Sequence, residues 1–336
     1  MVSECRKPVI IAGTYAIRNN LSAELNRLSL PCFSVAAAKG VIDEMLPHAA
    51  GVYTGVGLEL TPEFSIIKKA DLIIGIGLRH NEVLNVKPFE CESINLDSLG
   101  DECCYGFGFD HILPADRETL VGLFEGLERK SWGLTEVSDQ IHHMKRHLLR
   151  ASFMPANVFQ RIEQHFDHQV RIVLDTGNFC TIGEHIFRVN RPEYYLSAGQ
   201  GRYMGIGLPL SIGASLYDPN IPTVLFSGDG GIGMFISEVK LAVQYKLPLI
   251  VILMSDGYLG SIRVRSLLDR ITEKPVTIHQ PSWRKVFESI DMNAITAESE
   301  SDIEEILGNW GIEKGPLFIE THFDPEDYQR MTDSIR

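Results

Sequence analysis

Residues 222–263 read PTVLFSGDGGIGMFISEVKLAVQYKLPLIVILMSDGYLGSIR, and this stretch decides the fold. A short apolar run at 223–226 is followed by the glycine-rich turn SGDGG, and a second apolar run at 249–254 is followed by the turn SDGYLG. Between them, about Gly233 to Tyr245 has the length and composition of a helix. The stretch therefore predicts one strand–helix–strand unit of a parallel sheet.

The two turns of this unit carry a pair of aspartates. In a right-handed unit the two strands are parallel, so the turns that follow them emerge at the same edge of the sheet. Asp229 and Asp256 should therefore converge. Mg²⁺ is commonly held by one or two carboxylates together with phosphate oxygens of a ligand. With the backbone carbonyl near Tyr258, the pair predicts a magnesium and diphosphate site.

The glycines of the first turn fit the same site. Gly228, Gly230 and Gly231 allow the backbone to turn tightly and to approach a phosphate, and the amides at the start of the following helix should point at the same spot. The alternative is that the glycines form only a tight turn and that Asp256 only caps a loop. The combination of both turns at this spacing favours a binding site.

The rest of the chain alternates in the same way. Strands are expected at 9–12, 32–35, 72–76 and 93–96 in the first half, and at 170–174, 223–226, 249–254 and 317–321 in the second. A charged, helix-forming segment separates the halves, and Pro155 should begin a new helix. We predict an α/β protein with two doubly wound parallel-sheet domains, the first Rossmann-like: residues 1–130, a helical linker at 131–152, and residues 153–336.

These motifs resemble a known family. SGDGG, the following EVKLAVQYKLPLIVIL and the turn SDGYLGSIR are similar to the diphosphate-binding motif of thiamine-diphosphate enzymes of the acetolactate synthase and pyruvate decarboxylase type. The similarity extends upstream to GRYMGIGLPLSIGA at 201–214 and downstream to GPLFIETHFDPED at 315–327. The second half thus resembles the thiamine-diphosphate domain of that family.

The resemblance implies roles for particular residues. Asp229 and Asp256 would be the side-chain ligands of Mg²⁺, with Tyr258 a backbone ligand. Met204 would support the bent conformation of the cofactor, and Asn178 would contact the diphosphate. The full set of implied cofactor-binding residues is Asn178, Arg202, Met204, Gly228, Asp229, Gly230, Gly231, Asp256, Tyr258, Leu259 and Gly260.

Two positions depart from the family pattern. Asp256 stands where the family usually has Asn, so the site carries an additional negative charge and should depend more strongly on Mg²⁺. Arg202 stands where a glycine usually offers its carbonyl to the aminopyrimidine ring of the cofactor. The backbone of Arg202 could still serve in that role.

The first half resembles the central domain of acetolactate synthases. The similarity lies in RKPVIIAG, AAAKGVIDEMLPHAAGVYTG and KKADLIIGIGLRHNE. Some family members bind FAD in this domain. Here the GxG at Gly75 and Gly77 lacks the third glycine of a dinucleotide fingerprint, so FAD is not expected.

Relatives of this type usually have a third domain, which supplies the glutamate that activates the aminopyrimidine ring. No glutamate here lies in a recognisable version of that motif. Because this family binds the cofactor between two chains, we expect a separate chain to carry that domain, in a hetero-oligomer with a two-fold core.

The implied reaction is decarboxylation of a small 2-oxo acid with carbon–carbon ligation, as in acetolactate synthase, which would make the chain part of a transferase or lyase. A simple decarboxylase subunit and a non-catalytic thiamine-diphosphate-binding scaffold or sensor are the alternatives. A nicotinamide dehydrogenase with two Rossmann-like domains is a third and weaker alternative.

Composition excludes other classes of protein. The net charge of -13 argues against nucleic acid or an anionic membrane as the main partner, and no window approaches the roughly 18 apolar residues of a membrane span. The six cysteines are scattered without a CxxC pair, which predicts free thiols. The opening MVSECRKPVIIAG lacks the pattern of a secretory signal, so a cytoplasmic location is expected.

Overall fold

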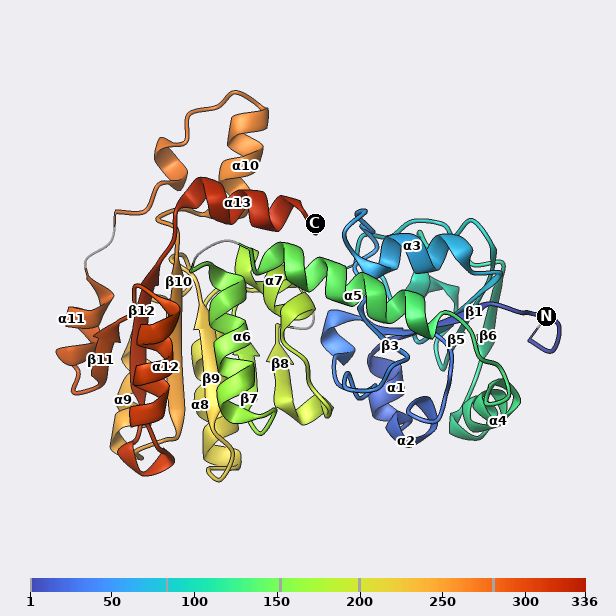
Figure 1. The fold of residues 1–336 in the computed structure, drawn as a ribbon, viewed down its shortest axis with the longest axis horizontal. Helices are drawn as coiled ribbons and strands as arrows, with labels where there is room; N and C mark the ends of the chain where they lie inside the picture. The colour runs from blue at the N-terminus through green and yellow to red at the C-terminus, as the bar shows by residue number, and fades with distance from the viewer. Residues whose placement is uncertain (1, 83, 151–152, 199–200, 280–281) are drawn as a thin grey trace.

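The computed structural model describes residues 2–82, 84–150, 153–198, 201–279 and 282–336. Two six-stranded sheets lie side by side along the long axis of the molecule, each covered by helices (Figure 1). Every strand pair in both sheets is parallel. The predicted doubly wound α/β fold with two sheets is confirmed.

The first sheet has the strand order β3-β2-β1-β4-β5-β6, so the order reverses between β1 and β4. Its strands are β1 (Pro8–Ala12), β2 (Cys32–Ser34), β3 (Ala49–Val52), β4 (Leu72–Ile76), β5 (Glu92–Asp97) and β6 (His111–Pro114). Its helices are α1 (Thr14–Arg18), α2 (Ser22–Leu25), α3 (Pro62–Lys69) and α4 (Arg117–Leu127), with the short 3-10 helices η1 (Ala36–Ala38) and η2 (Asp101–Cys104).

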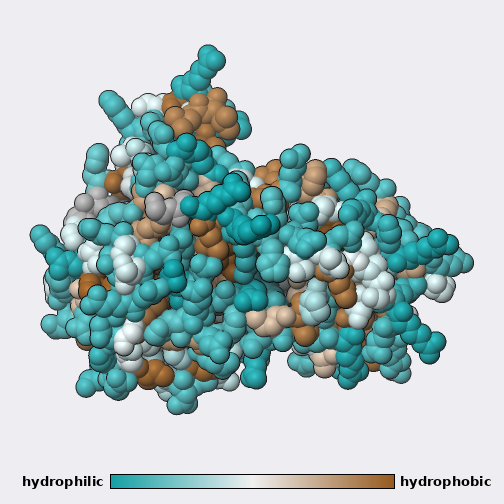
Figure 2. Space-filling model, viewed as in Figure 1, coloured by the Kyte–Doolittle hydropathy of each residue, from teal (hydrophilic) through white to brown (hydrophobic). Residues whose placement is uncertain are grey.

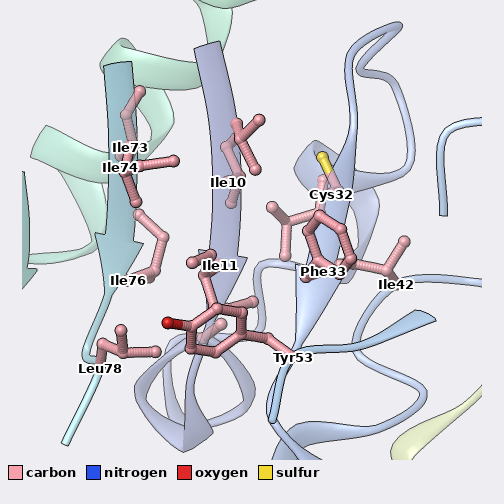
Figure 3. Packing of buried hydrophobic residues seen from close by; sticks show 14 of the residues in the cluster. Ile10, Ile11, Cys32, Phe33, Ile42, Tyr53, Ile73, Ile74, Ile76 and Leu78 are labelled. Carbon is pink, nitrogen blue, oxygen red and sulfur yellow. The ribbon is translucent and has the colours of Figure 1, made fainter. Parts of the chain in front are cut away.

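The core of this first domain is built on strands that are buried on both faces. Every residue of β1 and of β4 is buried. Figure 3 shows their isoleucines packing with Phe33 of β2 and with the ring of Tyr53. Strands covered on both faces appear in a sequence as continuous apolar runs, which is why these strands could be predicted.

The second sheet has the order β11-β12-β10-β9-β7-β8. Its strands are β7 (Arg171–Leu174), β8 (Tyr195–Ser197), β9 (Thr223–Ser227), β10 (Leu249–Ser255), β11 (Asn293–Thr296) and β12 (Leu317–His322). Its helices are α6 (Pro155–Phe166), α7 (Asn178–Ile186), α8 (Gly207–Tyr217), α9 (Val239–Gln244), α10 (Gly260–Leu268), α11 (Trp283–Glu288), α12 (Glu300–Asn309) and α13 (Pro325–Asp333), with the 3-10 helices η3 (Pro192–Tyr194), η4 (Ile236–Glu238), η5 (Lys274–Val276) and η6 (Ile312–Lys314).

Two apolar clusters cover the two faces of this second sheet. On β10, Ile250 and Ile252 pack in the cluster that α6, α7 and α12 complete, whereas Val251 and Leu253 pack with α8, α9 and α11. Successive side chains of a strand point to opposite faces, so each strand contributes to both clusters. The sheet is therefore a rigid support for the loops at its edges.

Helix α5 (Leu134–Leu148) connects the two domains and packs on both. Its Val137 belongs to the core of the first domain, and its Met144 and Leu148 belong to one of the clusters of the second. Among the described residues, no helix combines the length and the apolar character that crossing a bilayer requires.

The strands that the sequence did not predict are all edge strands. They are β3 and β6 in the first sheet, and β8 and β11 in the second. These strands are only three or four residues long, and β6 and β11 are largely exposed or half-buried. Edge strands lack the continuous apolar run of a central strand, so the pattern that predicted the others does not apply.

One buried histidine makes the fold sensitive to acid. His185 of α7 is 7% exposed, and burial lowers the pKa of its imidazole to about 4. An unfolded chain takes up a proton near pH 6.5 that the folded chain does not, so the free energy of unfolding should fall as the pH drops from 6.5 towards 4. The loss should be roughly 1 to 3 kcal/mol.

The urea midpoint of unfolding measured at pH 7.5 and at pH 5.0 tests this prediction. His185→Gln should lose less stability between the two pH values than the wild type, because glutamine does not titrate. His143→Gln, on the exposed face of α5, is the matched control and should behave as the wild type. An equal loss in the His185 variant would contradict the prediction.

Candidate cofactor and metal site

A cavity of about 220 Å³ lies where β7, β9 and β10 end. These neighbouring strands are parallel, so the turns after them meet at one edge of the sheet, next to the point where the strand order reverses. The cavity is lined by Thr176, Gly177, Asn178, Phe179, Met204, Gly228, Asp229, Gly230, Met254, Asp256, Tyr258, Leu259, Gly260, Ser261, Ile262 and Tyr328.

The two aspartates of the predicted metal site converge in this cavity. One carboxylate oxygen of Asp229 accepts hydrogen bonds from the backbone amides of Asp256, at 2.9 Å, and of Gly257, at 2.8 Å. The Asp256 carboxylate in turn accepts from the amide of Tyr258 at 3.0 Å. The first turn therefore orders the second, and both carboxylates and the Tyr258 backbone lie in one small volume.

The electrostatics of this pair require a counter-charge. Burial, and then the negative charge of Asp229, raise the pKa of the Asp256 carboxyl group to about 7. Within the described residues, no group of three or more histidine, cysteine or acidic side chains is arranged to hold a metal ion. A cation bound here would take its remaining ligands from the backbone and from an anionic ligand, which is the usual arrangement for Mg²⁺.

The glycines leave room for such a ligand. A Cβ atom on Gly230 would lie 2.7 Å from a methyl carbon of Leu259 and 3.1 Å from the sulfur of Met204, and one on Gly260 would lie 2.6 Å from the amide nitrogen of Asn178. A side chain at either position would fill the cavity. The backbone of both turns is therefore open to a ligand that approaches closely.

The helix predicted from about Gly233 to Tyr245 starts later than expected. Residues 229–235 form consecutive turns, and regular α-helix begins only at Val239, in α9. The glycines of this segment have low helix propensity, which accounts for the delay. The prediction that the amides of this helix point at the site is therefore wrong. Instead, α7 and α10 begin beside the cavity, with Asn178 and Gly260 as their first residues.

Met204 and Asn178 both line the cavity. Met204 is 38% exposed, and its sulfur lies over Gly230. Asn178 accepts a hydrogen bond from the Ser261 hydroxyl at 2.8 Å and donates one to the Gln329 side chain at 3.2 Å. Asn178 thereby joins the starts of α7 and α10 to α13, which crosses above the end of the sheet (Figure 1).

Gly231 and Arg202 lie outside the cavity wall. A Cβ atom on Gly231 would lie 2.0 Å from a carboxylate oxygen of Asp175, so this glycine makes room for that aspartate. The side chain of Arg202 turns away and forms an ion pair with Glu184 at 3.0 Å. The other residues predicted for the site line the cavity.

Asp175 is a residue of the site that sequence reasoning missed. It is 1% exposed, and its carboxylate accepts from the amides of Gly205, at 3.0 Å, and Gly207, at 3.4 Å, and from the Ser227 hydroxyl, at 3.0 Å. It therefore ties the loop that carries Met204 to the start of the glycine turn. Its position in LDTGN, directly after a predicted strand, was the available signal.

The corresponding edge of the first sheet is closed by its own side chains. The Glu82 carboxylate accepts hydrogen bonds from the amide of Thr14, at 3.1 Å, and from its hydroxyl. A Cβ atom on Gly13 would lie 2.3 Å from the carbonyl oxygen of Gly77. The carboxyl group of Glu82 thus stands between β1 and β4, where a sheet with this strand order approaches the diphosphate of a dinucleotide.

The excess negative charge of the pair predicts an effect of pH on the metal-free protein. Because the pKa of Asp256 is raised, the free energy of unfolding should fall as the pH rises from about 4 to 7, and the loss should be complete above pH 7. Asp256→Asn removes the titration but keeps the acceptor for the Tyr258 amide. We expect the metal-free variant to unfold about 2 to 6 °C above the wild type at pH 8.

Thermal unfolding with and without Mg²⁺ measures this effect. Mg²⁺ should raise the unfolding temperature of the wild type more than that of the variant. Asp291→Asn changes an exposed aspartate of the same domain and serves as the control. An unchanged metal-free unfolding temperature in Asp256→Asn would contradict a raised pKa of the Asp256 carboxyl group.

Two family models match the chain. The central domain of thiamine pyrophosphate enzymes matches residues 1–100, and the C-terminal thiamine-pyrophosphate-binding domain of these enzymes matches residues 175–321. The second match contains every residue that lines the cavity except Tyr328. Each match falls within one of the two domains: the first contains β1 to β5 but not β6, and the second contains β8 to β11 and most of β12 but not β7.

Curated relatives agree with these matches. A probable acetolactate synthase large subunit of Methanococcus aeolicus is 23% identical over 98% of this chain and 60% of its own length. A probable 2-ketoarginine decarboxylase of Pseudomonas aeruginosa is 26% identical over 78% of the chain and 48% of its own length. Glyoxylate carboligase of Escherichia coli O157:H7 is 24% identical over 90% of the chain and 56% of its own length.

The chain thus spans between about half and 60% of the length of the curated relatives that it matches. The two family models follow the two sheets, and the glycine turn with its paired aspartates lies in the C-terminal match. The chain belongs to the thiamine pyrophosphate enzymes, and its two domains are the central domain and the C-terminal thiamine-pyrophosphate-binding domain of that superfamily.

Proposed function

We propose that this chain binds thiamine diphosphate through Mg²⁺ and takes part in the decarboxylation of a 2-oxo acid with carbon–carbon ligation. The observation that carries the proposal is the convergence of Asp229 and Asp256 on a glycine-walled cavity beneath Met204. Two carboxylates and open backbone suit a divalent cation with a diphosphate. The net charge of -13 repels anions, so an anionic diphosphate needs the positive charge of a bound cation at this place.

Each wall of the cavity has a part in the proposed binding mode. Asp229 and Asp256 would hold Mg²⁺ together with the backbone of Tyr258, and the turns at Gly230 and Gly260 would receive the diphosphate. When bound, thiamine diphosphate supplies the carbon nucleophile for attack on the ketone of the 2-oxo acid. Met204 would contact the cofactor from the side opposite Gly230 and keep it bent.

The relatives support both branches of this chemistry. An acetolactate synthase and a carboligase are named for joining carbon units, and a decarboxylase is named for releasing CO₂. We place this chain with the ligating enzymes because its central domain resembles that of acetolactate synthases. A simple decarboxylase is the second candidate, favoured by the 26% identity to the decarboxylase.

Catalysis also needs a glutamate beside the aminopyrimidine ring. None of the described residues that line the cavity is a glutamate. We propose that a separate chain carries this glutamate on an aminopyrimidine-binding domain, in a cytoplasmic hetero-oligomer with a two-fold core. That FAD is not bound stays a prediction, consistent with the Glu82 carboxylate at the edge of the first sheet.

The surface around the cavity supports a partner. Several large apolar side chains are exposed on the loop of Met204, on the segment after the glycine turn and on α10, among them Tyr203 at 65%, Met234 at 52% and Leu268 at 71%. Figure 2 shows hydrophobic atoms on the projection that contains α10, and no residue of this helix is buried. Exposed apolar groups in such number are typical of a surface that another protein covers.

Filling the glycine turn should strongly weaken cofactor binding without unfolding the protein. Gly230→Ala places a methyl group against Leu259 and Met204, in the space that the diphosphate needs. We expect the Kd for thiamine diphosphate with Mg²⁺, measured by calorimetry, to rise at least about 30-fold. Gly213→Ala is the matched control, because a Cβ atom there meets no atom within 4 Å, and it should bind as the wild type.

Release of CO₂ tests the need for a partner. The chain is supplied with thiamine diphosphate, Mg²⁺ and a panel of 2-oxo acids, first alone and then with the proteins that co-purify from its native host. We expect activity only in the second case, and loss of that activity in Asp229→Ala. Full activity of the purified chain alone would refute the separate-chain proposal, and binding of the cofactor without activity in either case would favour a scaffold or sensor.

A further inference from the structure

The loop that carries Met204 contains an arginine in an unusual backbone conformation. Arg202 has a φ of 44°, in the left-handed region that favours glycine, and it stands where the family usually has glycine. Residues other than glycine, asparagine and aspartate occupy this region at a cost, so the surrounding structure must hold them there. The side chain of Arg202 shows what holds it.

Arg202 is anchored by a buried ion pair. Its guanidinium lies 3.0 Å from a carboxylate oxygen of Glu184, and the two side chains are 20% and 3% exposed. The other oxygen of Glu184 is buried and accepts no hydrogen bond from a described residue. A buried ion pair adds little net stability compared with apolar side chains of the same size, but it restricts both partners to one arrangement. In this protein the ion pair therefore acts mainly by fixing the position of Arg202.

Glu184 is itself held by the central domain. Its backbone carbonyl accepts a hydrogen bond at 2.9 Å from the ammonium of Lys39, which is 2% exposed and also pairs with Glu44 at 2.6 Å. Glu44 accepts from the backbone amide of Val189 at 2.8 Å. The end of α7 is therefore fixed by the first domain on one side and holds the Met204 loop on the other.

Met204 lies between two carboxylate anchors of this loop. Arg202, two residues before it, is bound to Glu184, and Gly205, directly after it, donates its amide to Asp175. Both carboxylates are buried. With both ends anchored, the backbone that carries Met204 is held where its sulfur can lie over Gly230.

We propose that Arg202 is a positioning residue for the cofactor: its ion pair with Glu184, held in turn by Lys39 of the central domain, places Met204 against the organic part of thiamine diphosphate. This inference rests on the proposed function. It assigns Arg202 no contact with the diphosphate, because its side chain lies outside the cavity that contains the glycine turns. The central domain thereby contributes to cofactor affinity without touching the cofactor.

Two ligands distinguish a positioning role of Arg202 from a general effect on the binding site. Thiamine diphosphate with Mg²⁺ uses both the glycine turns and Met204, whereas inorganic diphosphate with Mg²⁺ uses the turns alone. In Arg202→Gly and in Glu184→Gln we expect the Kd for thiamine diphosphate to rise about tenfold and the Kd for inorganic diphosphate to change less than about twofold. The double variant should be no weaker than either single variant, because both remove the same ion pair.

Conservative and control variants complete the test. Arg202→Lys keeps the positive charge and should retain affinity within about threefold of the wild type. Lys39→Met should weaken thiamine diphosphate selectively, and to a smaller extent than Arg202→Gly. Arg161→Gln breaks ion pairs with Glu300 and Glu304 elsewhere in the same domain and should change neither Kd.

Three outcomes would overturn the proposal. They are a parallel loss of inorganic diphosphate binding, additive effects in the double variant, and unchanged binding of thiamine diphosphate in Arg202→Gly. Thermal unfolding of each variant confirms that it is folded, and Arg202→Gly restores the residue that this backbone conformation favours. A wild-type chain that binds neither ligand would instead refute the proposed function itself, so the two failures are distinguishable.

Discussion

The parallel pairing of β9 with β10 is the constraint on which the site depends. The two strands are in register from Thr223 opposite Leu249 to Ser227 opposite Leu253. Both strands are fully buried, and their side chains enter the apolar clusters on both faces of the sheet, so neither strand can shift without moving a whole core. The ends of the two strands are therefore fixed. The aspartates that follow them are brought together even though their carboxylates repel each other.

The repulsion between the two carboxylates affects Asp256. The amides of Asp256 and Gly257 neutralise part of the charge of Asp229, but no basic side chain lines the cavity among the described residues. Burial, and then the negative charge of Asp229, raise the pKa of the Asp256 carboxyl group. A divalent cation removes the repulsion and gains ligands that are already arranged. The charge pattern thus makes the anionic ligand and the cation depend on each other, which suits a protein whose overall charge is negative.

The features that sequence reasoning found and missed differ in physical kind. The central strands were predictable because burial on both faces leaves a continuous apolar run, as in LIVILM of β10. The edge strands were not, because AAGV of β3 and HILP of β6 lack such a run. The paired aspartates were found because they follow two such strands. Asp175 follows a predicted strand too. Its role, however, depends on hydrogen bonds to amides 30 and 32 positions away, and no local sequence pattern indicates such contacts.

The sheet edge of the central domain lies against the second domain. Its sheet edge between β1 and β4, where related sheets bind a ligand, carries the Glu82 carboxylate and faces the second domain across a space of only about 20 Å³. Ala36 and Glu82 line that space from one side, and Glu184 and Arg202 line it from the other. The edge has therefore become a contact surface between domains. The central domain can thereby influence a ligand that it does not contact, because Lys39 helps to fix where α7 lies, and Glu184 of α7 pairs with Arg202 in the loop that carries Met204.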